Sequence, residues 1–277
     1  MNLEDFEKNG FIKFDELLSA NECNILYSKI KQSRNWGKEL FLSEEEYNKD
    51  PNPDRANPGK NIQNLVSNYN LDFIENNPQI KRILTNLLGN DYEILLTKFV
   101  VAVSSDWMPK YVEEMNKKEP LSNFNKFIKK EFRDVTYFRG LDLHMDSIDW
   151  ENANNKFITM YVYLNEVDHS MSPLEIVKGS HKLGHTQQPH YIEKIKNSNE
   201  IKYSLDNKKF LKFEKEKLVG ASGSVYFWTS NTLHGTAESK ESKESFRISL
   251  RYIIEKRKNS TGLIDKVIDQ EKVGKTR

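Results

Sequence analysis

His144 and Asp146 stand two residues apart in the segment RGLDLHMDSIDW (139–150). If this segment is a β-strand, its side chains alternate between two faces, so His144 and Asp146 share one face and the apolar residues Leu141, Leu143 and Met145 share the other. An imidazole and a carboxylate are costly to bury unless they have partners. Their spacing therefore indicates a shared polar site, whereas Asp142 and Asp149 are predicted to be turn or surface carboxylates.

A second histidine, His234, lies in NTLHGT (231–236), directly after the apolar run GSVYFWTS (223–230). Two histidines and one carboxylate can occupy one face of an octahedral metal ion and leave three positions open. This ligand set is typical of non-haem Fe(II) oxygenases, in which the open positions serve oxygen chemistry. An HxD pair alone occurs by chance in many chains, so the hypothesis depends on the ordered set of motifs.

The third motif is Arg247, thirteen residues after His234 in ESFRISLRY (244–252). A guanidinium that points into a β-structure needs a carboxylate, which it binds through two hydrogen bonds. The distal carboxylate of 2-oxoglutarate would supply this partner, and Thr236 could donate a further hydrogen bond to it. Arg251 shares the strand face of Arg247 and is the competing anchor.

The elements that must position these residues are mostly short strands. They are rich in β-branched and aromatic residues and separated by turn signals, and they are predicted at 10–14, 92–104, 142–148, 156–167, 172–179, 223–230 and 244–254. Helices are predicted after Ser19 or Asn21, and over residues 77–90, where Gly89 ends the pattern. Helices followed by strands predict an α+β domain with a mainly β core, a sandwich or a barrel.

We predict one domain over 1–277. Residues 1–91 form a helical N-terminal part, and residues 92–255 form a β core that contains an insertion at 105–136. Residues 256–277 form a charged, solvated C-terminal tail. Residues 43–61 are rich in turn formers and predict a loop. The segment 124–132 has helical spacing, and this helix either packs on the barrel or covers the site as a lid. In the second case Trp107, Phe124, Phe127 and Arg133 could contact substrate.

The composition excludes several classes of protein. The 42 Lys and Arg residues nearly balance the 41 Asp and Glu residues, so no overall charge favours nucleic acid or an anionic membrane. The single cysteine, Cys23, cannot form an internal disulfide and indicates a reducing compartment. The N-terminus lacks the pattern of a signal peptide, and no apolar run is long enough to span a bilayer. These features predict a cytoplasmic protein of undetermined oligomeric state.

The motifs together resemble the phytanoyl-CoA dioxygenase-like family of Fe(II)/2-oxoglutarate oxygenases. The opening DFEKNGFIKFDELLSANECNILYSKI (5–30) is similar to the start of that family, and IVKGSHKLGH (176–185) to its "vPGSHk-G" turn. LHMDS, TLHGT and FRISLRY are similar to its metal and co-substrate motifs. The resemblance extends over residues 5–255. It implies a double-stranded β-helix, also called a jelly roll, with flanking N-terminal helices.

By this resemblance His144, Asp146 and His234 bind Fe(II), and Arg247 binds 2-oxoglutarate with help from Thr236. Thr159 and Tyr161 lie where family members line the co-substrate pocket. Two departures concern the substrate rather than the iron: Lys178 replaces the proline of the turn, and the insertion 105–136 is long. The remaining histidines of the turn region are predicted at the surface or pocket rim, namely His181, His185 and His190.

The implied activity is hydroxylation of an unactivated C–H bond of a small molecule by O2, with release of succinate and CO2. Desaturation and other oxidations stay open, whereas halogenation requires a small residue where Asp146 stands. One alternative is a β-helix protein that binds a ligand without catalysis. Another is a metal enzyme without redox chemistry, which metal analysis and oxygen dependence would distinguish.

Overall fold

Two β-sheets form the body of the protein. The computed structural model describes residues 3–49, 64–118, 123–140, 143–146, 156–184, 191–237 and 246–268. The larger sheet has the strand order β1 (Phe11–Phe14), β9 (Val225–Thr229), β4 (Phe157–Tyr163), β11 (Ile248–Lys256), β2 (Tyr92–Ala102) and β3 (Thr136–Phe138). The smaller sheet has the order β10 (His234–Thr236), β5 (Leu174–Val177), β8 (Leu211–Leu218), β7 (Glu200–Ser204) and β6 (Tyr191–Lys194). All pairs are antiparallel except β2 with β3. This is the jelly-roll arrangement that the family resemblance implied, and it agrees with the sandwich or barrel that the strand pattern predicted.

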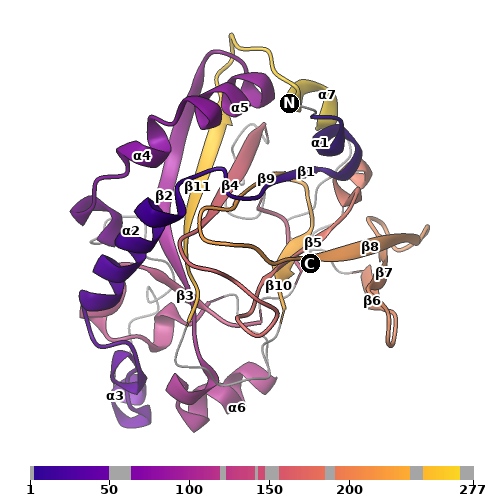
Figure 1. The fold of residues 1–277 in the computed structure, drawn as a ribbon. Coiled ribbons are helices and arrows are strands. Elements are labelled where there is room, and N and C mark those ends of the chain that lie inside the picture. Colours follow the sequence, from indigo (N-terminus) through magenta and orange to yellow (C-terminus); the bar gives the residue numbers. More distant parts are fainter. Residues whose placement is uncertain are drawn as a thin grey trace.

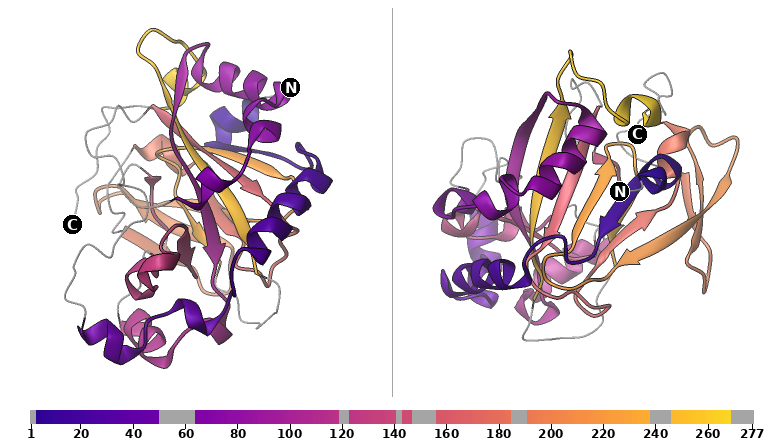
Figure 2. Two further views of the ribbon diagram at one scale, coloured as in Figure 1. Left: turned by 90° about the vertical axis from the view of Figure 1, so that its left-hand side faces the viewer. Right: turned by 45° about the horizontal axis from the view of Figure 1, so that its top comes forward.

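Helices cover one face of the larger sheet. The described helices are α1 (Glu4–Asn9), α2 (Ala20–Gln32), α3 (Glu44–Lys49), α4 (Asp72–Glu75), α5 (Pro78–Leu88), α6 (Lys110–Lys118) and α7 (Ile264–Val267). Figure 1 shows α2, α4 and α5 beside β2 and β11, and the left view of Figure 2 looks onto these helices with the strands behind them. Strands β6, β7 and β8 extend away from the body on the opposite side (Figure 1). None of the described helices is long and apolar enough to cross a membrane.

The two predicted helices form for the predicted reasons. The hydroxyl of Ser19 accepts a hydrogen bond from the amide of Glu22 and caps α2. Asn77 caps α5 by accepting from two amides, and Pro78 occupies the first turn, where its missing N–H costs nothing. Gly89 ends α5 with a φ of 88°, and a Cβ there would lie 2.0 Å from the Ser260 hydroxyl oxygen. Glycine is therefore required at this position.

The two faces of strand β11 contact two different hydrophobic clusters. Ile248, Leu250, Tyr252 and Ile254 belong to the hydrophobic core that includes α2 and α5. Alternation directs the intervening residues, among them Ser249 and Arg251, to the opposite face, toward the space between the sheets. A second cluster fills that space with residues of both sheets: Phe11, Val100, Ala102, Phe138, Tyr161, Tyr163, Val167, Leu174, Ile176, Leu218, Tyr226 and Trp228.

Two segments differ from their predictions. Residues 44–49 form α3 rather than a loop, because Ser43 and Glu46 make a capping box in which each side chain accepts from the other's amide. Residues 50–61 lie outside the described part of the chain. The helix predicted over 124–132 is instead two 3-10 turns, Asn125–Phe127 and Lys130–Phe132.

These turns pack inward. Phe124, Phe127 and Ile128 are fully buried, and the Asn125 side chain binds the backbone at Val135 and Tyr137. Phe124 and Phe127 are therefore core residues and not the substrate contacts that a lid would offer.

The C-terminal segment is not entirely solvated either. Within its described part, Lys256 is buried and Ile264 and Val267 of α7 belong to the core. Residues 269–277 lie outside the described residues.

Candidate metal centre and co-substrate pocket

His144 and His234 are held by one pair of backbone hydrogen bonds. The amide of His144 donates to the carbonyl of His234 over 2.8 Å, and the amide of His234 donates back over 2.9 Å. His234 also lies in β10, opposite Ile176 of β5. Of the strand predicted over 142–148, the described residues 143–146 contain only this single bridge, and residues 142, 147 and 148 lie outside the described part of the chain. The bridge is nevertheless sufficient to place both rings side by side.

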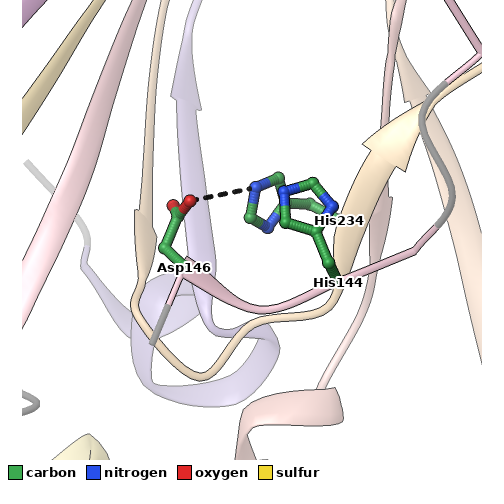
Figure 3. A group of neighbouring side chains, drawn as sticks. All are labelled: His144, Asp146 and His234. Atoms are coloured by element: carbon green, nitrogen blue, oxygen red, sulfur yellow. Dashed lines mark ion pairs between the residues drawn. The ribbon is translucent and has the colours of Figure 1, made fainter. Parts of the chain in front are cut away.

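The three predicted metal ligands converge (Figure 3). One ligand atom from each of His144, Asp146 and His234 lies within 4.8 Å of the others. The imidazole centroids are 4.4 Å apart, and Nε2 of His234 is 3.5 Å from Oδ1 of Asp146. Asp146 and His234 are buried and His144 is partly buried. Two imidazoles and a carboxylate facing one point suit a divalent transition metal.

The hydrogen bond of His234 fixes which nitrogen faces this point. Nδ1 lies 3.0 Å from the carbonyl oxygen of Thr232, which can only accept, so Nδ1 carries the ring proton. Nε2 therefore presents its lone pair toward Asp146 and His144. A carbonyl that orients a ligand histidine in this way is a common outer partner in metal sites.

Asp146 is surrounded by donors. Its Oδ2 accepts from the Thr159 hydroxyl at 2.5 Å and from Nε1 of Trp228 at 2.9 Å, while its Oδ1 forms an ion pair with Arg251. Burial alone would raise the pKa of Asp146, but the charge of Arg251, together with the neighbouring His234 and His144, outweighs it and holds the pKa well below its usual range. The carboxylate is therefore ionised, as a metal ligand must be.

Arg247 precedes β11 and is completely buried. Its guanidinium lies 4.7 Å from the ring centroid of Phe138, and 5.8 and 5.7 Å from those of Tyr161 and Tyr163. None of its three side-chain nitrogens has a hydrogen-bond partner among the described residues. A buried guanidinium bounded by aromatic faces is a site for an anion of matching shape.

Tyr163 forms one wall of this aromatic pocket. Burial raises the pKa of its hydroxyl to about 12, although the charge of Arg247 opposes the shift. The hydroxyl donates to the carbonyl of Leu218 and accepts from the amide of Leu174. It is thus neutral and fixed, and it keeps the wall in place.

The other predicted pocket residues lie either at the Arg247 end of the site or at its metal-ligand end. Tyr161 contacts both the Arg247 guanidinium and, at 5.7 Å between centroids, Trp228. Thr236 is buried on β10 opposite Leu174, the residue whose amide binds Tyr163. Thr159, predicted to line the co-substrate pocket, donates a hydrogen bond to Asp146.

Sequence reasoning missed Trp228 as a donor to Asp146. The available signal was strand alternation, because Trp228 and Tyr226 of β9 face the same interior as Tyr161 of the neighbouring β4. It also did not assign Ser249, whose buried hydroxyl has no partner among the described residues and lies on the Arg251 face of β11.

His181 is not at the surface or the pocket rim as predicted. It is buried against α1, its Nε2 donates to the carbonyl of Glu7, and burial lowers its pKa to about 4. It is absent from the group of potential metal ligands found among the described residues. His185, His190, Asp142 and Asp149 lie outside the described residues.

Comparison with known proteins supplies the family. Solved structures share the fold at low sequence identity, among them the following three. SnoK, a non-haem α-ketoglutarate-dependent carbocyclase from nogalamycin biosynthesis, is 13% identical with a TM-score of 0.53, covering 92% of this chain and 82% of SnoK. The non-haem monooxygenase ThoJ is 12% identical with a TM-score of 0.53, covering 91% and 76%. HygX from Streptomyces hygroscopicus, solved with nickel and 2-oxoglutarate, is 11% identical with a TM-score of 0.50, covering 94% and 88%.

A sequence search among curated proteins finds no significant match. In contrast, the family described as phytanoyl-CoA dioxygenase matches residues 6–245, which include all three predicted metal ligands. This chain belongs to the phytanoyl-CoA dioxygenase family of Fe(II)- and 2-oxoglutarate-dependent oxygenases.

Proposed function

We propose that the protein is an Fe(II)/2-oxoglutarate-dependent oxygenase that hydroxylates an unactivated C–H bond of a small molecule. The observation that carries this proposal is the combination of a three-ligand cluster with a buried guanidinium whose nitrogens have no partner among the described residues. The cluster suits Fe(II), and the guanidinium suits the distal carboxylate of a dicarboxylate.

Each residue has a role that follows from its contacts. His144, Asp146 and His234 would hold Fe(II), with Nε2 of His234 as its donor atom. Bound Fe(II) would supply the redox chemistry that couples oxidation of 2-oxoglutarate to succinate and CO2 with insertion of oxygen into substrate. Arg247 would bind and orient the distal carboxylate, assisted by Thr236.

The protein also excludes water from this pocket. Phe138, Tyr161 and Tyr163 surround the Arg247 guanidinium and are almost completely buried. Without bulk water, the bond between the guanidinium and a carboxylate is stronger than at the surface. Tyr161 connects the two ends of the site, since its ring contacts both Arg247 and Trp228.

We infer a small-molecule substrate, of natural-product, lipid or sugar type. The nearly neutral charge of the chain argues against nucleic acid, and SnoK acts in the biosynthesis of a natural product. Hydroxylation is the default outcome, and ThoJ is described as a monooxygenase. Asp146 occupies the position that a halide would need, which argues against halogenation.

The proposal is tested by loading the protein with Fe(II) under anaerobic conditions, titrating 2-oxoglutarate by calorimetry, and measuring succinate after admission of air. We expect one Fe(II) and one 2-oxoglutarate per chain, and succinate formation that depends on both. His234→Ala should abolish metal binding, whereas His169→Ala, which removes an exposed histidine, should not.

Two results would contradict the proposal. Ligand binding that persists without metal would favour a non-catalytic binding protein. Metal binding without any consumption of 2-oxoglutarate in air would favour a metal enzyme without redox chemistry.

A further inference from the structure

Arg251 makes an ion pair with the carboxylate of Asp146. It extends from β11, where it lies opposite Lys98 of β2 and Tyr161 of β4, and its terminal NH2 group binds Oδ1. The side chain of Arg251 is 14% exposed and that of Asp146 is 1% exposed, so the pair is nearly shielded from water.

The two oxygens of Asp146 have different surroundings. Oδ2 is occupied by two neutral donors, the hydroxyl of Thr159 and the indole N–H of Trp228. Oδ1 is the oxygen that faces His234, at 3.5 Å from Nε2. A metal shared by Asp146 and His234 must therefore approach Oδ1, which is also the oxygen that Arg251 binds.

We propose that Arg251 is a positioning residue that serves as the internal counter-ion of Asp146 and lowers the affinity of the site for its metal. This inference rests on the proposed function, because it takes His144, Asp146 and His234 as the metal ligands. Arg251 is thus assigned a role distinct from that of Arg247.

Two electrostatic effects act on the pair of Arg251 and Asp146. Before metal binds, a buried carboxylate without a cationic partner would destabilise the fold, and Arg251 supplies that partner. Once metal binds, two cations share one carboxylate in a nearly dry site, where their repulsion is poorly screened. Arg251 should therefore stabilise the metal-free protein more than the loaded protein.

By linkage, such a preference for the metal-free state appears as weakened metal affinity. Removing the charge of Arg251 should lower the stability of the metal-free protein and, by the same coupling, tighten metal binding. A side chain that contributed only packing would stabilise both states equally and would leave the metal affinity unchanged.

Thr159 offers a matched comparison, because it contacts the same carboxylate without carrying charge. Its hydroxyl holds Oδ2 and leaves Oδ1 turned toward His234. Losing this bond should loosen the orientation of a ligand and weaken metal binding, as is common when outer partners of metal ligands are removed. The two variants should therefore change metal affinity in opposite directions.

The experiment measures Co(II) affinity by calorimetry and thermal unfolding with and without Co(II), in the absence of 2-oxoglutarate. We expect Arg251→Met to lower the Tm of the metal-free protein and to bind Co(II) about tenfold more tightly, equivalent to ~1.4 kcal/mol. Arg251→Lys, which keeps the charge, should stay within about threefold of wild type, a difference of ~0.7 kcal/mol. Thr159→Val should bind Co(II) more weakly than wild type.

An unchanged or weakened Co(II) affinity in Arg251→Met would overturn the inference, as would equal losses of Tm with and without Co(II). Should Arg251→Met not fold, Arg251→Gln provides the same comparison, with the same expected tightening of Co(II) binding. Failure of the proposed function gives a different result: wild-type protein would not bind Co(II), or His234→Ala would bind it as tightly as wild type.

Discussion

Replacing Arg247 with methionine should change two quantities in opposite ways: the stability of the fold and the affinity for 2-oxoglutarate. Methionine keeps the length and much of the volume of the side chain but removes the charge. Arg247 is completely buried, and its three side-chain nitrogens lack hydrogen-bond partners among the described residues. The variant should therefore be more stable than wild type without 2-oxoglutarate, and much poorer at binding it.

The size of both effects follows from the contacts. A buried charge that has lost its partner costs roughly 3–5 kcal/mol. The aromatic rings around Arg247 return about 0.5–2 kcal/mol of this, which leaves a net gain on the order of 2 kcal/mol for the variant. For a chain of this size, 1 kcal/mol corresponds to roughly 2–4 °C in Tm. Loss of a buried, hydrogen-bonded charge pair with the co-substrate costs about 2–5 kcal/mol, or roughly 30-fold to a few thousand-fold in affinity.

Thermal unfolding and calorimetric titration of 2-oxoglutarate, both on metal-loaded protein, measure these quantities. Arg34→Met is the matched control, because the Arg34 guanidinium is also largely buried but is paired with both oxygens of Asp134. That variant should lose stability and keep its affinity for 2-oxoglutarate. If Arg247→Met is less stable than wild type and binds 2-oxoglutarate normally, Arg247 is a structural residue and the anchor must be sought elsewhere.

Three further predictions concern the scaffold. Burial lowers the pKa of His181 from 6.5 to about 4, so as the pH is lowered the unfolded chain is protonated at this histidine before the folded protein is. The free energy of unfolding should therefore fall by up to about 3 kcal/mol as the pH is lowered from 6.5 to 4. Denaturant unfolding of His181→Gln over this range should show a smaller loss, and a loss equal to that of wild type would refute the role of His181. Phe127→Ala should destabilise the protein by about 3–5 kcal/mol, since the ring is fully buried and packs against Tyr47 and Tyr111; a change below about 1 kcal/mol in denaturant unfolding would contradict this packing. Hydrogen exchange should protect the amides of residues 124–138 equally with and without Fe(II) and 2-oxoglutarate, because Asn125 already binds the backbone of this segment; protection that rises only with ligand would identify a lid.

Motifs and periodicity predicted the parts of the fold that local chemistry determines. The capped helices α2 and α5 follow from Ser19, Asn77 and Gly89. The strands that carry β-branched and aromatic residues on both faces were found, including β4 and β11. The order of the metal and co-substrate motifs along the chain also predicted three metal ligands, and the fold brings these within reach of one another.

Other elements depend on long-range contacts that sequence spacing does not contain. The segment 124–132 has apolar residues at helical intervals, but Asn125 and Arg133 bind backbone carbonyls through their side chains and hold it in separate turns. Strands β6 to β8 were missed because their residues alternate charged and apolar types with many lysines, a weak strand signal when read alone. Trp228 could be placed facing the interior, but its bond to Asp146 depends on how β9 lies against the HxD segment.

Arg247, which directly precedes β11, and Arg251 within it show what sequence spacing leaves undecided. Alternation places Arg247 and Arg251 on the same side and cannot tell which one is the anchor. The contacts of the two arginines differ. Arg251 lies opposite Tyr161 of β4 and forms an ion pair with Asp146. Arg247 lies beyond Ser249 and Tyr163, the last pair between β11 and β4, where aromatic rings surround it and its nitrogens have no hydrogen-bond partner among the described residues. A buried guanidinium that is already neutralised by a protein carboxylate has no need of a further anion, and one that is not neutralised destabilises the fold until an anion binds. The charge that the fold leaves uncompensated is therefore the one available to a dicarboxylate, and on these physical grounds, which are independent of its position in the motif, we propose Arg247 as the anchor.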